Sequence, residues 1–180
     1  AIEKQGRWLQ GQDAAALLAA PSQAQEPRQP ALSAQTPGGL VPHDESLRSL
    51  DVIFPVLHGP LGEDGTVQGL LELADIPYVG CGVAASAVGM DKATCKAVFA
   101  AHGLPQAPYL TLKRLRWQAA PEAVLDAIEA QLPYPVFVKP ANLGSSVGIS
   151  KAGGRDSLRR ALNEAARYDR KLVVEQGIDA

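Results

Sequence analysis

Cysteine and histidine are both scarce in this sequence, and their scarcity excludes several kinds of site. The 180 residues include two cysteines and three histidines. Cys81 and Cys95 fit none of the ligand spacings of structural zinc sites, and they suit a reducing compartment. No histidine belongs to a readable Ser-His-Asp arrangement. The sequence therefore gives no sign of a zinc site or of a catalytic triad.

A strong charge of either sign and a long apolar run are also missing. The formal net charge is −2 and the pI is about 5.9, which gives no electrostatic case for binding nucleic acid or an anionic membrane. No apolar run approaches the roughly 20 residues that a membrane-spanning helix needs. With 46% hydrophobic residues, the chain can build a sizeable core. We expect a cytoplasmic protein of one ordinary domain or two small ones.

The first half of the chain is expected to alternate strands with helices. Residues 20–46 are rich in Pro, Gln, Ser, Ala and Gly, which predicts a surface loop or an insertion. Residues 51–57, "DVIFPVL", form a continuous apolar run that is typical of a strand buried on both faces. A helix with an apolar stripe is expected over 67–74, a short strand over 76–80 and a helix within 84–90. This alternation suggests a parallel sheet.

The second half is expected to form an antiparallel sheet with helices on one face. Asp91 is predicted to cap a helix whose apolar stripe ends at a half-buried His102, and Gly103 to end that helix. The segments around residues 136–151 have the short spacing of a hairpin, which favours antiparallel pairing. The expected strands are 107–112, 134–140, 147–151 and 171–176, and the expected helices begin at Pro121 and cover 158–165.

A loop rich in glycine and serine follows the strand "VFVKP". Lys139 is expected at the end of this strand, where its ammonium group can hold a phosphate as a point charge. Gly144 and Gly148 allow backbone amides to approach a ligand closely, and Ser145 and Ser146 add hydroxyl donors. The spacing is not that of a Walker A loop. Taken alone, the stretch is equally compatible with a polar hairpin turn beside a solvated lysine.

A second loop, "LHGPLGEDG", places a histidine and two carboxylates close together. His58 follows the predicted strand 51–57 at its carboxyl end, where open α/β sheets hold their ligands. Glu63 and Asp64 lie at the start of the next helix, where they favour the helix dipole without any further role. Alternatively, a histidine and a carboxylate in one tight loop can bind an amine or a carboxylate and stabilise a charged intermediate.

Together, "LHGPLGEDGTVQGLLELADIPYVGCGVAASAVGMDK" and "FVKPANLGSSVGISK" resemble the D-alanine–D-alanine ligases of the ATP-grasp superfamily. The resemblance runs from about residue 51 to 180 and is weaker over 1–12. It implies an α/β fold, with a partial N-terminal Rossmann-like substrate domain over 1–90. Residues 91–180 would form the first, antiparallel α+β part of the ATP-grasp domain. We therefore expect a fragment that lacks the family's N-terminal start and its C-terminal catalytic part.

The resemblance also implies a reaction and its cofactors. ATP phosphorylates one D-alanine, and the amine of a second D-alanine attacks the acyl phosphate to give the dipeptide used in peptidoglycan. Mg²⁺ is required, but its ligands would lie outside this chain. The family is typically dimeric. We expect the isolated chain to be inactive in ligation. Alternatives are a D-alanine–D-lactate or D-alanine–D-serine ligase, and a non-catalytic nucleotide-binding fragment or pseudoenzyme.

Roles for individual residues follow from the same resemblance. Two lysines match the pair that binds ATP phosphates, and two serines match the loop that covers them. The first of these serines also matches a residue that orients substrate. A glutamate matches the acceptor for the adenine amino group, and the two residues lining the first D-alanine site are a histidine and a second glutamate. The phosphate-binding lysines are Lys92 and Lys139, and the serines of the covering loop are Ser145 and Ser146. The acceptor for adenine is Glu175, with Gln176 and Ile178 beside it. His58 and Glu63 line the first D-alanine site.

Overall fold

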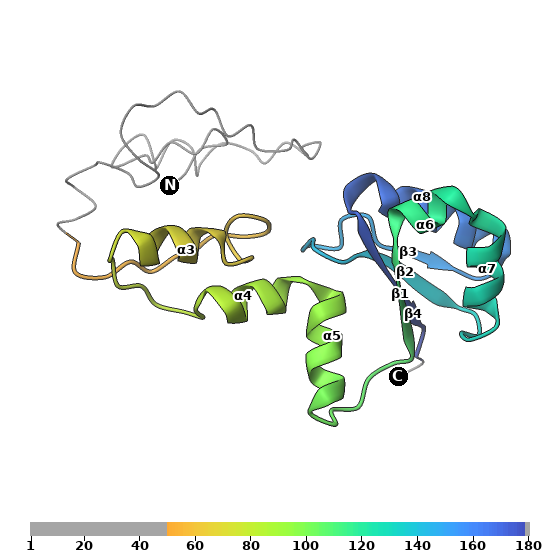
Figure 1. The fold of residues 1–180 in the computed structure, drawn as a ribbon, viewed down its shortest axis with the longest axis horizontal. Coiled ribbons are helices and arrows are strands. Elements are labelled where there is room, and N and C mark those ends of the chain that lie inside the picture. Colours follow the sequence, from red (N-terminus) through yellow and green to blue (C-terminus); the bar gives the residue numbers. More distant parts are fainter. Residues whose placement is uncertain (1–49, 179–180) are drawn as a thin grey trace. The chain divides into compact units, whose positions relative to one another are not determined.

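The computed structural model describes residues 50–178, which are coloured in Figure 1. The predicted loop over 20–46, the N-terminal match over 1–12 and Trp8 lie outside these residues. Within them, ten helices and strands follow one another, and the second half contains a four-stranded sheet.

The sheet is antiparallel throughout, as the sequence predicts for this half. Its strands are β1 (Tyr109–Lys113), β2 (Val136–Pro140), β3 (Ser150–Ala152) and β4 (Lys171–Gln176). Their order is β1-β4-β2-β3, so the last strand of the chain lies between β1 and β2. The predicted hairpin is confirmed, because β2 pairs directly with β3.

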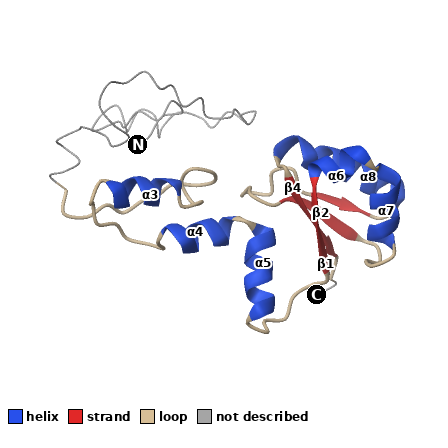
Figure 2. Cartoon of the chain, in the orientation of Figure 1, coloured by secondary structure: helices blue, strands red, loops and turns tan. Residues whose placement is uncertain are grey.

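Three helices cover one face of this sheet (Figures 1 and 2). They are α6 (Arg114–Ala119), α7 (Pro121–Glu129) and α8 (Arg155–Tyr168). Pro121 begins α7 at a position where its missing N–H costs nothing. The apolar stripe of α8 is buried as predicted, because Leu158, Ala161, Leu162 and Ala165 all pack into the core. Trp117 is also buried, and its indole N–H donates to Asn163 Oδ1 over 2.9 Å.

The opposite face of the sheet carries the polar side chains. Strand pairing aligns Tyr109 with Glu175, Glu175 with Phe137, and Phe137 with Lys151. Paired residues of an antiparallel sheet point to the same face, so these four form one row across it. Lys139 lies in the next row on the same face, because residues two apart share a side. Helix α5 (Lys92–Ala101) approaches this face, where its Ala93 is buried with Ala141 and Val173.

The start of α5 follows the prediction, but its apolar stripe does not. Asp91 caps the helix by accepting from the Thr94 amide over 3.0 Å, and Gly103 follows it with a φ of +69°. The predicted half-buried His102 is wrong, because this residue is exposed and so are Val98 and Phe99. The helix meets the sheet through its first half, where the Lys92 amide donates to Ala141 O over 2.9 Å and Lys96 pairs with Glu175 of β4.

The buried parallel strand expected over 51–57 is also a wrong prediction for the described residues. This segment makes one parallel bridge, between Ile53 and Tyr78, and the predicted strand over 76–80 is limited to that bridge. Val56 remains 72% exposed. A strand buried on both faces needs neighbours at both edges and layers above and below. Among residues 50–178 only the segment around Tyr78 pairs with it.

The helices of this first half match their predictions. Helix α3 (Thr66–Leu73) buries Val67, Gln68 and Leu71. Helix α4 (Val83–Met90) consists mainly of small residues and buries none of them. The parallel sense of the bridge agrees with the expected strand–helix alternation, although no sheet is built there within the described residues.

Candidate functional site

The polar face of the sheet centres on the carboxylate of Glu175, from β4. Lys96 Nζ lies 2.5 Å from its Oε1, and Lys139 Nζ contacts its Oε2. Only 14% of the Glu175 side chain is exposed. Burial opposes ionisation of this carboxyl, but the hydrogen bonds from Lys139 and Lys96 prevail and lower its pKa. The group is therefore a fixed, ionised acceptor.

Lys92 connects this cluster to the loop after β2. Its amide donates to Ala141 O, and its ammonium group donates to Leu143 O. Burial and, secondarily, the charge of Lys139 lower the pKa of Lys92. We call Lys92, Lys96, Lys139 and Glu175 the lysine cluster. Its three ammonium groups and one carboxylate leave two positive charges, which is an electrostatic environment suited to a polyphosphate.

The glycine–serine loop leaves the sheet directly beside the lysine cluster. Its first amide, at Asn142, donates to Asp169 Oδ2 over 2.7 Å. Ser145 and Ser146 both have positive φ, at 48° and 59°, and both are exposed. The loop closes back onto itself through the bond from Ile149 N to Ser146 O, 3.2 Å long. Its two hydroxyl groups are therefore presented to solvent next to the lysines.

The histidine loop is ordered by its carboxylates. Glu63 Oε2 accepts from Gly59 N over 2.5 Å, and Asp64 accepts from Leu61 N and Thr66 N over 2.9 and 3.0 Å. Burial opposes ionisation of Asp64, but the hydrogen bonds from these amides outweigh it and lower the pKa of Asp64. His58 is exposed, with its Nδ1 4.0 Å from Glu63 Oε1. Both acidic residues thus hold the loop backbone, a role that the sequence did not reveal.

The two motif loops come close to each other. A Cβ atom added at Gly144 would lie 4.0 Å from Glu63 Oε2. The structure therefore brings Glu63, predicted for the D-alanine site, near the glycine–serine loop. Lys92, Lys139 and Glu175 belong to the lysine cluster.

Gln176 and Ile178 lie beyond the cluster at the end of β4. The Gln176 amide donates to Pro108 O over 2.9 Å, which continues the sheet past β1. Ile178 is 66% exposed, so its side chain is free to contact a ligand.

Sequence reasoning missed Lys96. This residue lies four positions after Lys92 on α5, and side chains four apart on a helix project from the same face. That spacing was the available signal. It is informative only once the first lysine is known to face the sheet, which depends on tertiary packing.

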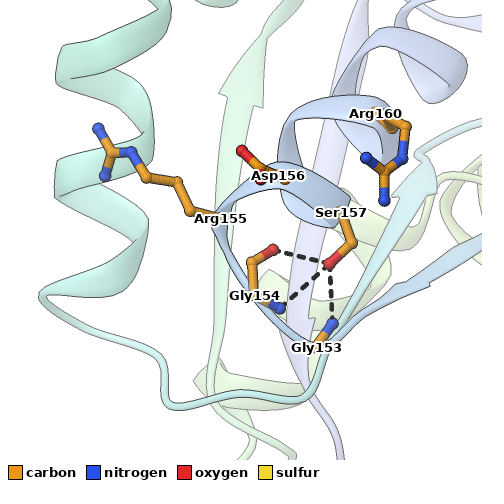
Figure 3. Close-up of a pocket in the computed structure, with 6 residues that line it drawn as sticks. All are labelled: Gly153, Gly154, Arg155, Asp156, Ser157 and Arg160. Atoms are coloured by element: carbon orange, nitrogen blue, oxygen red, sulfur yellow. Dashed lines mark hydrogen bonds between the residues drawn. The ribbon is translucent and has the colours of Figure 1, made fainter.

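An open depression lies away from all of these residues, at the beginning of α8 (Figure 3). Its backbone amides are already bonded, because Gly153 N and Gly154 N both donate to Ser157 Oγ over 3.1 Å. Arg155 points away from it and pairs with Glu122, Asp126 and Glu129. The lysine cluster is therefore the better candidate site.

Two further searches covered the described part of the chain. Among residues 50–178, no three His, Cys, Asp or Glu side chains gather in a way that could hold a metal ion. Over the same residues, every helix is too short or too polar to cross a membrane.

A four-stranded antiparallel sheet with helices on one face, and lysines beneath a glycine–serine loop on the other, defines an ATP-grasp type of nucleotide-binding fold. A family model described as the N-terminus of D-ala D-ala ligase matches residues 1–81, and one described as its C-terminus matches residues 98–180. The chain belongs to the D-alanine–D-alanine ligase family.

Individual relatives agree with this assignment. The chain is 52% identical over 181 residues to the D-alanine--D-alanine ligase of Heliobacterium modesticaldum, covering 99% of this chain and 50% of the relative. It is 60% identical over 130 residues to that of Geobacillus thermodenitrificans, covering 72% and 36%. The chain thus spans half or less of the length of these curated relatives.

Solved structures give the same fold. The VanG D-Ala:D-Ser ligase of Enterococcus faecalis matches with a TM-score of 0.67 and 42% identity, over 73% of this chain and 37% of that one. The D-alanine-D-alanine ligase of Coxiella burnetii matches with a TM-score of 0.64 and 40% identity, over 73% and 39%.

Proposed function

We propose that this chain is the part of a D-alanine–D-alanine ligase that receives ATP and the first D-alanine. The observation that carries the proposal is the lysine cluster, in which Lys139 pairs with an ionised, largely buried Glu175 and Lys92 lies close to Lys139. It lies next to the serine loop, on the face of the sheet that α6, α7 and α8 leave open.

The proposed reaction has two steps. The γ-phosphoryl group of ATP moves to the carboxylate of one D-alanine, giving D-alanyl phosphate and ADP. The amine of a second D-alanine then attacks the acyl carbon, and phosphate leaves as the peptide bond forms. The product would serve peptidoglycan synthesis. Because an acyl phosphate hydrolyses in open water, the site needs a loop that closes over it.

On the nucleotide side, Lys92 and Lys139 would neutralise the phosphates, and Ser145 and Ser146 would cover them from the exposed loop. Glu175 would accept from the adenine amino group. Gln176 and Ile178 would border the base, the first through its main chain and the second through its exposed apolar side chain.

On the substrate side, His58 and Glu63 would line the first D-alanine site. The backbone of their loop is held by bonds from its amides to the carboxylates of Glu63 and Asp64, which would position the loop before substrate arrives. Ser145 would orient the substrate from the opposite loop, whose Gly144 is close to Glu63.

Mg²⁺ would be required by the whole enzyme, since phosphoryl transfer needs divalent charge at the γ-phosphate. Its ligands are proposed to lie outside this chain, as the family resemblance implies. Among residues 50–178, no three His, Cys, Asp or Glu side chains gather in a way that could hold a metal ion. A homodimer, a cytoplasmic location and the division of the chain near residue 90 are further parts of the proposal.

The alternative ligase functions differ from the proposed one in the second substrate. The similarity to a D-Ala:D-Ser ligase favours testing D-serine beside D-alanine. D-lactate belongs in the same comparison, because a hydroxyl nucleophile would give an ester in place of an amide. A non-catalytic nucleotide-binding fragment is the alternative from a different class.

The test is amino-acid-dependent phosphate release from ATP. It is measured first with the 180-residue chain and then with the chain extended at both ends. We expect activity only in the extended protein. There, Lys139→Ala should raise the KM for ATP about tenfold or more, since it removes a charge-assisted contact. Lys151→Ala, on the same sheet face, should not raise it.

Ser145→Ala separates the two roles proposed for this serine. If Ser145 orients the substrate, kcat should fall more than the affinity for ATP. The reverse result would restrict Ser145 to covering phosphate. An extended protein that binds ATP and releases no phosphate with any of the three substrates would favour the non-catalytic alternative.

A further inference from the structure

Lys96 is the member of the lysine cluster that no motif identified, and it is the most firmly held. Its Nζ lies 2.5 Å from Glu175 Oε1 and 4.8 Å from the ring centroid of Tyr109. Its carbonyl oxygen accepts from Gln106 Nε2 over 2.8 Å. Both ends of the residue are therefore fixed, and its side chain is only 15% exposed.

Lys139 contacts the same carboxylate in a different setting. It binds the other oxygen, Oε2, and its side chain is 24% exposed. It lies at the end of β2, directly before the glycine–serine loop, and close enough to Lys92 for the two charges to repel. Of the two lysines that pair with Glu175, Lys139 is the more exposed and the nearer in sequence to the loop, so it is the ammonium group that an incoming phosphate can more readily draw away.

Moving Lys139 to a phosphate would remove one of two counterions from the largely buried carboxylate of Glu175. A buried carboxylate without a partner is costly and tends to take up a proton. A protonated carboxyl group is no longer a dedicated acceptor, so it would stop discriminating in favour of an amino group. A second ammonium group that stays in place prevents this outcome.

We propose that Lys96 is a positioning residue that holds the Glu175 carboxylate in place when Lys139 exchanges this carboxylate for a nucleotide phosphate. The inference rests on the proposed function. Lys96 keeps Oε1, and the departure of Lys139 frees Oε2 to accept from the amino group of adenine. The nucleotide itself thus opens the acceptor that recognises its base.

The proposal predicts a specific defect in base selection. ITP carries a carbonyl oxygen where ATP carries its amino group, so an ionised Glu175 should repel ITP and accept from ATP. The readout is the ratio of the two Kd values, which loss of phosphate binding alone does not change. Both can be followed by NMR titration of the 180-residue chain, a method that resolves millimolar affinities.

The variants are Lys96→Met, which keeps the apolar stem and removes the charge, and Lys96→Arg, which restores a cation. Lys151→Met is the matched control: Lys151 is in the same sheet row, and it makes no ion pair within residues 50–178. We expect the wild-type ratio Kd(ITP)/Kd(ATP) to be about tenfold and to fall to about one in Lys96→Met. Lys96→Arg should recover most of the preference, and Lys151→Met should keep it.

A carboxyl ¹³C titration of Glu175 gives an independent readout without nucleotide. Lys96→Met should raise the pKa of Glu175, because one of its two cationic partners is lost. An unchanged pKa, or an unchanged Kd ratio in Lys96→Met, would overturn the role of Lys96 and leave the proposed function standing. A wild-type chain with no preference for ATP would overturn the adenine contact itself, and both proposals with it.

Discussion

Apolar side chains are buried to different extents in two regions of the molecule, residues 109–178 and residues 50–104. In the first region, the sheet and helices α6, α7 and α8 enclose one core in which Leu125, Leu158 and Leu162 are fully buried. In the second region, Phe54 and Val56 are exposed in an extended segment with a single bridging partner. Both regions contain apolar runs in the sequence.

This difference shows that an apolar run in the sequence needs other segments to pack against it, but does not guarantee that the fold supplies them. Antiparallel strands close in sequence supply each other's neighbours, as β2 and β3 do. A strand buried on both faces depends on several other segments. The histidine loop and the glycine–serine loop are instead stabilised locally, by the carboxylates of Glu63 and Asp64 and by the bonds around Lys92.

The strongest test of this difference between the regions is one leucine-to-alanine substitution in each of them. Leu162 is 0% exposed on α8, and Leu73 is 70% exposed on α3. Leu162→Ala should lower the free energy of unfolding by about 2–5 kcal/mol, because it leaves a cavity in a closed core. Leu73→Ala should change it by less than about 0.5 kcal/mol. Urea denaturation followed by circular dichroism measures both, and equal losses would contradict the division into two kinds of region.

The sequence predicted residues 109–178 almost completely. The stripe of α8 has the helical period, Pro121 marks the start of α7, and all four strands are apolar runs bounded by turns. These are local signals, and here local pairing satisfies them. For residues 50–104 the prediction failed at the segment 51–57 and at His102, because their burial depends on which distant segments pack against them and not on the period of the sequence.

For the candidate site, the sequence supplied the motif residues but not their contacts. The resemblance gave Lys92, Lys139 and Glu175, and the fold places them together. No pattern revealed that Glu175 would bind two lysines, since Lys96 is identified only by the register of β4 and the approach of α5. The holding role of Glu63 was equally hidden, because it depends on the turn geometry of the histidine loop.

Two glycines of the glycine–serine loop test whether this loop packs against the core. Gly148 has a φ of +69°, and an added Cβ would lie 2.7 Å from Tyr168 Cδ2 and 2.8 Å from Pro140 Cγ. Gly148→Ala should therefore lower the free energy of unfolding by about 1–3 kcal/mol. Gly144→Ala is the control, since the nearest atom to its added Cβ is 4.0 Å away. Thermal unfolding measures both, and a harmless Gly148→Ala would mean that the loop is not packed on the core.

Asp91 links the two regions, and pH tests that link. Its Oδ1 caps α5, and its Oδ2 lies 2.5 Å from Lys171 Nζ on β4. Burial opposes ionisation, but Lys171 and the Thr94 amide lower the pKa of Asp91 below its ordinary value. The contribution to stability is therefore full above the unfolded pKa of about 3.9, and it is lost as pH falls through the lower folded pKa.

Asp91→Asn keeps an acceptor for Thr94 and removes the charge that Lys171 needs. We expect a loss of about 1 kcal/mol at neutral pH, of the size of a weakened helix cap. The difference from wild type should shrink as pH falls from about 5 to 2. Urea midpoints measured across that range decide the matter, and a difference independent of pH would assign the loss to the cap and not to the ion pair.

The smallest expected effect concerns the charges on the outer surface of residues 109–178. Arg155, at the start of α8, pairs with Glu122, Asp126 and Glu129 around α7, with distances of 2.9 and 2.7 Å to the first two. Arg155→Met should lower the melting temperature slightly at low salt. Near 1 M salt the Debye length is about 3 Å, so the difference from wild type should nearly vanish. Arg167→Met is the control, because Arg167 is more exposed and pairs only with Glu164, 3.2 Å away, among the described residues. If Arg155→Met were as destabilising as Leu162→Ala and insensitive to salt, the helices would be held together by this charge cluster more than by the core beneath it, and the contrast between the two regions would need a different physical basis.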